Sequence, residues 1–492
     1  MAVRMNADHY DPLRSYKPHY AVRTKIIATV GPACSAPEMM YRLAEAGVDV
    51  FRINMAHGSR AFHDAMVTQV RQISEQLGRP LAVLVDLAGP KIRLGELAED
   101  PLMCHVGQTL RVVAADRATS GDELPCALSS VVHELEPGNL VMLADGTVVL
   151  QVIGRVEQGV EVRVLSGGWV RSRQGINLPD ARLSVSALTE EDRQNAVWAA
   201  QREVDFLGLS FVRSPRDVWQ LRELLDSVGS SAMIVAKIEK REALVALDDI
   251  VATADAVMVA RGDLGVEIDV AETPVIQKRI IATCQRYLKP VIVTTQILES
   301  IQHSQRPTRA EVSDVANAIL DGADACMLSA ETAVGEYPVE SVQVMNRVMA
   351  ATEQLLRDAP PEQPPVAAFA GVHPITAALT YGAGRIAAQI AAAMVVIATR
   401  SGHTARVKSK LHDFIPTIAV SDSEATLRRM CLFWGIFPLR GAPVNDGPQL
   451  RTYIEEWGKQ QGLLRPTDRV VFVTGTNFVP VAHNMLIVHE VT

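Results

Sequence analysis

Eight short apolar runs, separated by helix-like segments, restrict the fold of this chain more than any other feature. Segments with helical periodicity, such as 36–46 and 274–287, lie between most of the runs. A continuous apolar run is typical of a strand buried on both faces, as in parallel sheets. Eight strands alternating with helices predict an α/β fold, a (β/α)8 barrel. The runs are 24–30, 50–54, 81–87, 206–212, 232–238, 256–261, 290–296 and 325–331.

The gap between the third and fourth runs is much longer than the others and has a different pattern. Short alternating runs at 108–114, 140–143, 148–153 and 160–165 are separated by turn pairs such as Pro137-Gly138. This pattern predicts a small β-barrel domain over residues 92–187, inserted into a loop on the catalytic face. We expect it to act as a lid over the active site.

A proline-dense stretch at 358–365 predicts a linker after the barrel. Helix-like and strand-like segments alternate beyond it, with expected helices at 375–392, 404–411 and 424–433 and strands at 394–399, 417–420 and 469–474. They predict a separate three-layer α/β domain. The expected organisation is an N-terminal segment at 1–20, a catalytic barrel at 21–91 and 188–357, a lid at 92–187 and a regulatory domain at 358–492.

Composition excludes several classes of protein. The formal net charge of −8 argues against general nucleic-acid binding. Six scattered cysteines without a CxxC pair favour reduced thiols and no zinc site. The first twenty residues lack an apolar signal region, and the longest apolar tract, 386–398, is too short to span a bilayer. We expect a cytoplasmic protein without membrane contact.

Charged and polar residues gather where the predicted strands end, which is where an α/β barrel places its catalytic groups. Cations facing two acids suit phosphoryl transfer with a divalent metal, although ion-paired strand ends would give the same pattern. No Walker A loop or kinase-type glycine-rich loop is visible. The candidates are Arg52, Asn54, Asp86, Arg93, Lys237, Glu239, Arg261, Asp263, Thr295, Gln296 and Glu331.

Seven ordered motifs give the chain a family resemblance over essentially its whole length. They are TKIIATVGP at 24–32, RINMAH at 52–57, GPKIR at 89–93, KIE at 237–239, MVARGDLGV at 258–266, TQILES at 295–300 and RPTRAEVSDVAN at 306–317. With these motifs the chain closely resembles the pyruvate kinases. The resemblance implies phosphoryl transfer from phosphoenolpyruvate to ADP, which gives pyruvate and ATP in the last step of glycolysis.

The same resemblance implies roles for individual residues. Glu239 and Asp263 look like ligands of Mg²⁺ or Mn²⁺, and Lys237 would stabilise the phosphoryl group in transit. Arg52 would grip the phosphate. Thr295 would help to protonate the enolate. The substrate carboxylate would be held by Gly262, Asp263 and Thr295, and the nucleotide side would include Asn54, His57 and Arg93, although His57 would serve equally well as a loop brace.

The chain departs from the most familiar pattern of the family around the monovalent cation. Ala56 stands where many members have serine, and Lys91 where they have glutamate. Asn54 and Asp86 remain, so the K⁺ site would lack one oxygen, and Lys91 would supply the positive charge by pairing with Asp86. We therefore expect activity without K⁺.

Two further departures lie nearby. Leu87-Ala88 stands where a threonine–lysine pair is common. Glu191 stands at the usual position of a nucleotide-side lysine, which puts one ATP contact in doubt.

A loop in the last domain resembles the sugar-phosphate effector loop of the family. Its residues Thr399, Ser401, Gly402 and Thr404 lie between a predicted strand and a helix, where backbone amides can face a phosphate, although an ordinary helix cap would look the same. The loop at 475–484 carries no arginine or lysine for a second phosphate. We expect activation by a monophosphorylated sugar or nucleoside monophosphate in a homotetramer.

Two rival functions fit less well. A lyase barrel acting on phosphoenolpyruvate would share the metal carboxylates, but it would not be expected to combine the inserted β domain with KIE at 237–239. A non-enzymatic sensor of sugar phosphates would be expected to have lost Lys237 or a metal ligand, and both are present.

Overall fold

The computed structural model describes residues 22–144, 146–179, 181, 185–358, 372–475 and 485–492. The first twenty residues, most of the predicted linker and the loop at 476–484 lie outside this described part.

Eight parallel strands close into a barrel, which confirms the predicted fold class. Neighbouring strands follow the order β1-β16-β15-β14-β13-β12-β3-β2 around the barrel. Almost every strand residue is buried, as expected for strands covered on both faces. The strands are β1 (Lys25–Thr29), β2 (Val50–Asn54), β3 (Ala82–Asp86), β12 (Phe206–Leu209), β13 (Met233–Ile238), β14 (Ala256–Ala260), β15 (Val291–Thr294) and β16 (Ala325–Leu328).

Helices surround the barrel, and several begin at strong caps. Thr189 and Thr308 form capping boxes, and the Ser59 hydroxyl accepts from the backbone N–H of Phe62. The helices are α2 (Pro37–Ala46), α3 (Arg60–Gln76), α5 (Glu190–Gln201), α6 (Pro215–Ser227), α7 (Arg241–Val245), α8 (Leu247–Thr253), α9 (Arg261–Glu267), α10 (Thr273–Arg286), α11 (Arg309–Leu320), α12 (Ala330–Ala333) and α13 (Pro338–Asp358).

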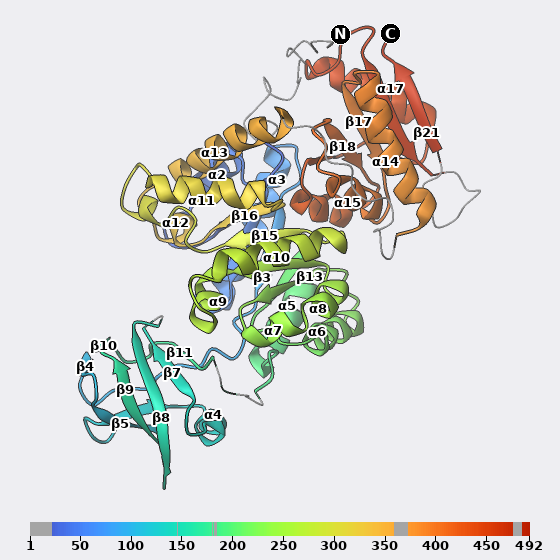
Figure 1. Ribbon diagram of the computed structural model, residues 1–492. Coiled ribbons are helices and arrows are strands. Elements are labelled where there is room, and N and C mark those ends of the chain that lie inside the picture. The colour runs from blue at the N-terminus through green and yellow to red at the C-terminus, as the bar shows by residue number, and fades with distance from the viewer. Residues whose placement is uncertain (1–21, 145, 180, 182–184, 359–371, 476–484) are drawn as a thin grey trace, which may run out of the picture.

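An inserted domain lies between β3 and α5 and projects from one end of the barrel (Figure 1). It contains a six-stranded sheet in the order β11-β7-β8-β9-β5-β6, a β10-β4 pair and one short helix. Its buried Leu and Val residues form a core separate from that of the barrel. The elements are β4 (Leu102–Cys104), β5 (Thr109–Ala114), β6 (Glu123–Cys126), α4 (Ser129–Glu134), β7 (Leu140–Leu143), β8 (Val148–Val156), β9 (Gly159–Ser166), β10 (Gly168–Val170) and β11 (Ile176–Asn177).

The C-terminal domain is a five-stranded sheet in the order β19-β18-β17-β20-β21, with helices on both faces. Alternate residues of β17 enter two different cores, Met394 and Val396 on one face and Val395 and Ile397 on the other, so the domain has three layers. Its elements are α14 (Pro374–Gln389), β17 (Met394–Ala398), α15 (His403–Ser409), β18 (Thr417–Val420), α16 (Glu424–Arg429), β19 (Ile436–Leu439), α17 (Gly447–Gln460), β20 (Arg469–Thr474) and β21 (Met485–Glu490).

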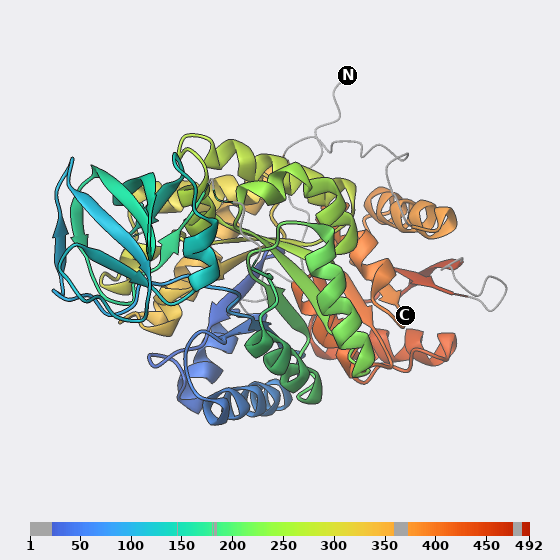
Figure 2. The same ribbon diagram turned by 90° about the horizontal axis from the view of Figure 1, so that it is seen from below.

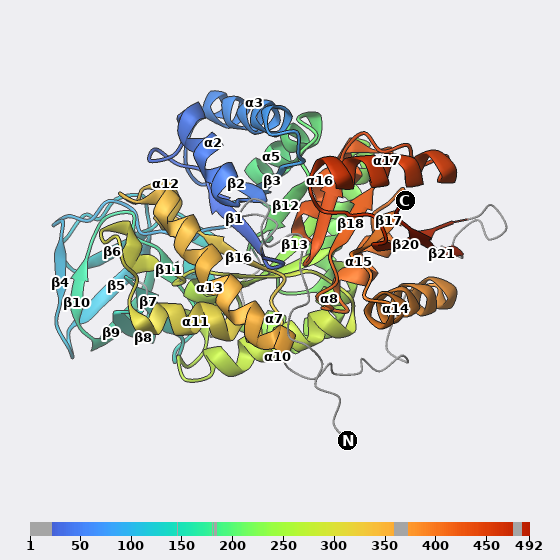
Figure 3. The same cartoon turned by 90° about the horizontal axis from the view of Figure 1, so that it is seen from above.

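The inserted and C-terminal domains lie at opposite sides of the barrel (Figures 2 and 3). Barrel-interior residues such as Phe206 and Met258 share one buried cluster with Leu427 and Met430 of the C-terminal domain. The C-terminal domain therefore packs against the N-terminal end of the barrel. The C-terminal ends of the strands face the inserted domain.

Candidate active site

The C-terminal ends of β2, β3 and β13 bring four charged side chains into one buried network. Arg52 Nε donates to Asp86 Oδ2 at 2.8 Å. Lys237 Nζ lies 3.3 Å from Asp86 Oδ1 and 2.8 Å from Glu239 Oε1. Nζ also donates to Ser210 Oγ at 2.7 Å. Because Lys237 and Glu239 are two residues apart on one strand, their side chains lie on the same face, and barrel closure adds Asp86 from β3.

Burial and charge act in opposite directions on this network. Burial alone would raise the pKa of Asp86, but Lys237 and Arg52 outweigh it and hold the pKa below its ordinary value. Burial would lower the pKa of Lys237, but Asp86 and Glu239 raise it. Lys237 therefore stays charged, and the network carries a fixed ammonium at the strand ends.

The pKa of Glu239 is shifted in the opposite direction from that of Asp86. Burial raises its pKa, Lys237 lowers it, and the negative charge of Asp263 raises it again, so that the net pKa lies above the ordinary value. One oxygen of Glu239 accepts from the backbone N–H of Phe211 at 2.7 Å. Two carboxylates that repel each other in a buried site fit a divalent cation with a preference for oxygen ligands.

Thr295 occupies a left-handed backbone conformation directly after β15, with φ of 65°. The next residue, Gln296, has φ of 52°. Thr295 Oγ1 accepts from the backbone N–H of Gly262 at 2.7 Å and donates to the Thr294 carbonyl at 2.6 Å. Strained conformations of this kind persist where the surrounding structure holds them, often at functional sites. The hydroxyl is thereby fixed beside the first turn of α9.

Arg261 holds the two loops together. Its guanidinium donates to the Thr295 carbonyl at 2.7 Å and pairs with Asp314 at 2.7 Å. Among the candidates, Arg261 is therefore engaged in anchoring loops of the protein. Glu331 lies in α12, just after the eighth strand, and its carboxylate accepts from the backbone N–H groups of Ser329 and Leu298.

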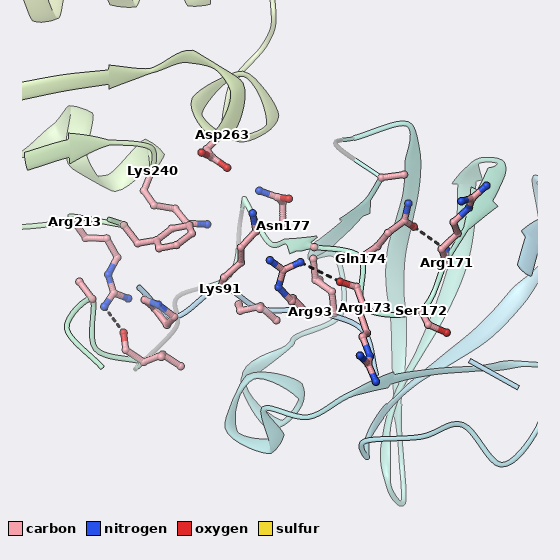
Figure 4. Close-up of a pocket in the computed structure, with 18 residues that line it drawn as sticks. Lys91, Arg93, Arg171, Ser172, Arg173, Gln174, Asn177, Arg213, Lys240 and Asp263 are labelled. Carbon is pink, nitrogen blue, oxygen red and sulfur yellow. Dashed lines mark hydrogen bonds between the residues drawn. The ribbon is translucent and has the colours of Figure 1, made fainter. Parts of the chain in front are cut away.

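A cavity of about 390 Å³ lies between the barrel and the inserted domain (Figure 4). Among the described residues that line it, Asp263 is the one acid, against six cations. In Figure 4, Lys240 and Asp263 come from the barrel, and Arg93 and Asn177 approach from the inserted side. A strongly cationic cleft of this size suits a phosphorylated ligand. The cations are Lys91, Arg93, Arg171, Arg173, Arg213 and Lys240.

Two family models match the chain, "Pyruvate kinase, barrel domain" over residues 21–342 and "Pyruvate kinase, alpha/beta domain" over residues 377–489. The chain belongs to the pyruvate kinase family.

Similar proteins agree with that assignment. Pyruvate kinases from Agrobacterium vitis and Mycobacterium intracellulare are each 40% identical, over 93% and 92% of this chain and 94% and 95% of their own lengths. A solved pyruvate kinase from Cryptosporidium parvum has a TM-score of 0.89 at 29% identity and covers 98% of this chain and 99% of its own. Pyruvate kinases transfer the phosphoryl group of phosphoenolpyruvate to ADP with Mg²⁺.

The structure places the predicted nucleotide residues at different points. Arg93 lines the cavity and donates to the Arg173 carbonyl at 3.2 Å. Asn54 ends β2, and its Oδ1 accepts from the backbone N–H of Ala56. His57 is exposed, and its carbonyl oxygen lies 2.8 Å from His63 Nε2. Asn54 and His57 are not among the described residues that line the cavity.

The pairing predicted between Lys91 and Asp86 is absent from the described part of the structure. Arg52 on β2 and Lys237 on β13 pair with the two carboxylate oxygens of Asp86, and Lys91 is exposed on the cavity wall. The charge of Lys91 is therefore available to the cavity, and not to the carboxylate.

Sequence reasoning missed several polar residues of the site. Ser210 follows β12 and receives a hydrogen bond from Lys237. Arg171, Arg173 and Lys240 line the cavity. Lys240 comes one residue after KIE at 237–239, so its position next to that motif could have predicted that it lies at the site. The two arginines enter the site through the placement of the inserted domain.

Glu191 is exposed in the first turn of α5, beside the capping box of Thr189 and Asp192. An acid there is favourable, because the N-terminal end of a helix carries partial positive charge. This gives a structural reason for glutamate at the position.

The predicted effector loop follows β17. Thr399 Oγ1 accepts from the backbone N–H of Gly402 at 3.1 Å, and Gly402 has φ of 81°. Ser401 is exposed and Thr404 is buried. The loop is a tight turn into α15, with the Ser401 hydroxyl at its surface.

All six cysteines are free and buried. Among the described residues, no group of three or more His, Cys, Asp and Glu side chains is arranged to hold a metal. None of the helices in the described ranges combines the length and hydropathy that crossing a bilayer requires.

Proposed function

We propose that Lys237 and Arg52 carry the phosphoryl transfer of this pyruvate kinase family member. The supporting observation is the position of Lys237 Nζ, 3.3 Å from Asp86 and 2.8 Å from Glu239 at the mouth of the barrel. A fixed ammonium in a buried site neutralises charge that grows on a transferring phosphoryl group without reorganising water. Arg52, oriented by Asp86, grips the phosphate of phosphoenolpyruvate.

Glu239 and Asp263 hold Mg²⁺ or Mn²⁺ in this proposal. The effect of Asp263 on the pKa of Glu239 supports it, because a divalent cation between the two carboxylates removes their repulsion. Bound there, the metal supplies positive charge to the substrate oxygens.

The substrate carboxylate is received by the first turn of α9 and by Thr295. The backbone N–H groups of Gly262 and Asp263 lie in that turn, and the Thr295 hydroxyl is held against Gly262. From this position Thr295 belongs to the route that protonates the enolate, with the proton delivered directly or through water.

ADP occupies the cationic cavity in this proposal. Arg93 lines the cavity directly, and Asn54 and His57 border the end of β2. Six cations facing one described acid favour a polyphosphate. His57 is exposed and is not among the described residues that line the cavity.

We infer that the enzyme works without K⁺. Ala56 removes one oxygen beside Asn54, and Lys91 adds a fixed ammonium to the cavity wall. That ammonium stands in for the monovalent cation toward bound ligand, and not toward Asp86.

We also propose that a phosphorylated sugar or nucleoside monophosphate activates a homotetramer through Thr399, Ser401, Gly402 and Thr404. The exposed hydroxyl of Ser401 at the turn into α15 supports the proposal. Binding would favour an active arrangement and lower the apparent KM for phosphoenolpyruvate.

One assay tests these proposals together. Pyruvate formation is measured with and without K⁺, and with glucose 6-phosphate, ribose 5-phosphate, AMP or fructose 1,6-bisphosphate. Activation by the bisphosphate alone, or activation unchanged in Ser401→Glu, rejects the effector proposal. Ser401→Gln is the matched control, because it adds the same bulk without the charge.

A further inference from the structure

The turn that follows β12 contacts both the active-site network and the segment that leads into the inserted domain. Ser210 and Phe211 form this turn directly after the strand ends at Leu209. Phe211 has φ of 56°, in the left-handed region that a bulky side chain rarely adopts. A conformation of this kind persists only where the surrounding structure holds it, and it is common beside functional sites.

The backbone of Phe211 holds one of the proposed metal ligands. Its N–H donates to Glu239 Oε2 at 2.7 Å, and the other carboxylate oxygen, Oε1, lies 2.8 Å from Lys237 Nζ. The Glu239 side chain is 1% exposed, so these two contacts fix the orientation of its carboxylate. Because each carboxylate oxygen has two lone pairs, both oxygens can still face a cation.

The side chain of Phe211 packs against Gly89 at the entrance to the inserted domain. Gly89 follows β3 and has φ of 65°. A Cβ atom at Gly89 would lie 2.7 Å from Phe211 Cδ2, which is closer than carbon atoms approach each other. Glycine therefore provides both a left-handed backbone and room for the ring. The N–H of Gly89 donates to Asp192 Oδ1 at 3.3 Å, and Asp192 belongs to α5, which follows the inserted domain.

Ser210 connects the same entrance segment to Lys237. Its hydroxyl donates to the Leu87 carbonyl at 2.8 Å and accepts from Lys237 Nζ at 2.7 Å. The backbone N–H of Leu87 donates to the Gly208 carbonyl at 2.9 Å, which continues the pairing of β3 with β12 past the end of β3. The turn after β12 thus joins the entrance segment to Lys237 through Ser210 and to Glu239 through Phe211.

Packing alone does not account for the backbone of Phe211. A phenylalanine ring can fill a gap from an ordinary conformation with negative φ, without the cost of the left-handed region. In the left-handed turn the N–H of Phe211 instead meets a buried carboxylate of the active site. The contact between this N–H and Glu239 is therefore the feature that the strained turn produces.

We propose that Phe211 is a positioning residue for Glu239. Its ring, packed against Gly89, holds the left-handed turn, and the turn directs the Phe211 N–H to the carboxylate. The segment that enters the inserted domain is thereby coupled to the affinity of the cation site. The proposal rests on the function proposed for Glu239 as a metal ligand, and it adds the group that orients this ligand.

Mn²⁺ binding to the full-length enzyme without substrates, measured by calorimetry, tests the proposal. Phe211→Ala removes the ring but keeps the backbone donor, and it should raise the Kd for Mn²⁺ about tenfold or more, as is typical when a group that orients a metal ligand is lost. Phe211→Tyr keeps the ring against Gly89 and should hold the Kd within about twofold. Circular dichroism should confirm that each variant is folded.

Phe414→Ala is the matched control. It makes the same truncation at a half-buried ring in the C-terminal domain, whose centroid lies 5.4 Å from that of Trp434. This variant loses packing far from the cation site, so its Kd for Mn²⁺ should equal that of the wild type.

A double-variant cycle tests whether Gly89 acts through the ring. Gly89→Ala places a methyl group 2.7 Å from Phe211 Cδ2 and should also weaken Mn²⁺ binding. The cost of a left-handed alanine at this position is the same with either residue at 211, so it cancels in the cycle. Gly89→Ala should therefore lose much less Mn²⁺ affinity in the Phe211→Ala background than in the wild type. Because Gly89→Ala leaves the ring in place, it gives a readout even where Phe211→Ala does not fold.

Glu239→Gln separates this proposal from the assignment on which it rests. If Glu239→Gln binds Mn²⁺ like the wild type, the ligand assignment fails, and the role of Phe211 fails with it. If Glu239→Gln weakens binding but folded Phe211→Ala or Gly89→Ala does not, the assignment stands and the positioning role is overturned. Equal loss in Phe414→Ala, loss of binding in Phe211→Tyr, or additive losses in the double variant also overturn it.

Discussion

Replacing Lys237 by methionine removes the central cation of the active-site network. The ammonium contacts Asp86 at 3.3 Å, Glu239 at 2.8 Å and Ser210 at 2.7 Å, and the side chain is almost fully buried. Methionine keeps the length and apolar stem of lysine, so the substitution removes mainly charge.

Two effects of this substitution have different magnitudes and different readouts. Loss of one preorganised electrostatic contact to a transition state costs roughly 3–4 kcal/mol, or about 10²–10³ in kcat. Loss of one partner from a buried ion pair destabilises a fold by roughly 3–5 kcal/mol. Because Arg52 still pairs with Asp86 while Glu239 loses its cation, we expect the destabilisation to fall near the lower end of that range.

The assay separates the half-reactions. Phosphoryl transfer is followed by coupled pyruvate formation from phosphoenolpyruvate, and protonation is followed with enolpyruvate supplied directly. Lys237→Met should lose much more of the first activity than of the second, and circular dichroism should confirm that the variant is folded. The control is Lys278→Met, which removes a half-exposed surface pair with Asp321 and should change stability by less than about 1 kcal/mol. Equal loss of both half-reactions in a folded variant would refute the assignment.

Three further outcomes are expected. Lys91→Glu should make turnover depend on added K⁺ in tetramethylammonium buffer, and the double variant that also carries Ala56→Ser should depend on K⁺ more strongly. Full activity of the double variant without K⁺ would contradict the inference. Thr295→Ala leaves the Gly262 amide without its acceptor and should slow proton exchange of pyruvate about 10²-fold, whereas Thr295→Ser should retain it. Burial would raise the pKa of Asp324, but the charge of Lys410 lowers it below its ordinary value. The ionised Asp324 therefore stabilises the fold above the unfolded pKa of about 3.9, and this stabilisation is lost as the pH falls further. Lys410→Met should therefore flatten the loss of stability in urea unfolding below about pH 4, and an unchanged acid profile would count against it.

The strands could be predicted from the sequence because the pattern of apolar residues within each strand is local. β2, β18 and β20 begin and end where the apolar runs predicted them. Other strands end earlier than predicted, as at Leu328, because α12 begins at Ala330 while the apolar run continues. β19, α17 and β21 were missed. Strand β19 contains Pro438, which lacks a backbone donor and weakens the strand signal.

Spacing along one strand also predicted that Lys237 and Glu239 share a face. Tertiary structure decided which groups meet them. Barrel closure places Asp86 and Ser210 within reach of Lys237. Asp86 consequently pairs with Arg52 and Lys237, and Lys91 does not pair with Asp86. The physical reason is that strand order and register set the distances between residues far apart in the chain.

Four aspartates that directly precede barrel strands, Asp49, Asp205, Asp255 and Asp324, illustrate the same distinction between sequence and tertiary structure. The chain carries an aspartate before each of four strands, so the repeat is a property of the sequence. The packing of the C-terminal domain against the barrel decides which of these aspartates are covered. Lys410 of that domain pairs with Asp324, and Arg428 pairs with Asp205. Asp255 instead borders a pocket, because the packed surfaces do not meet there, and no local pattern of residues encodes that separation.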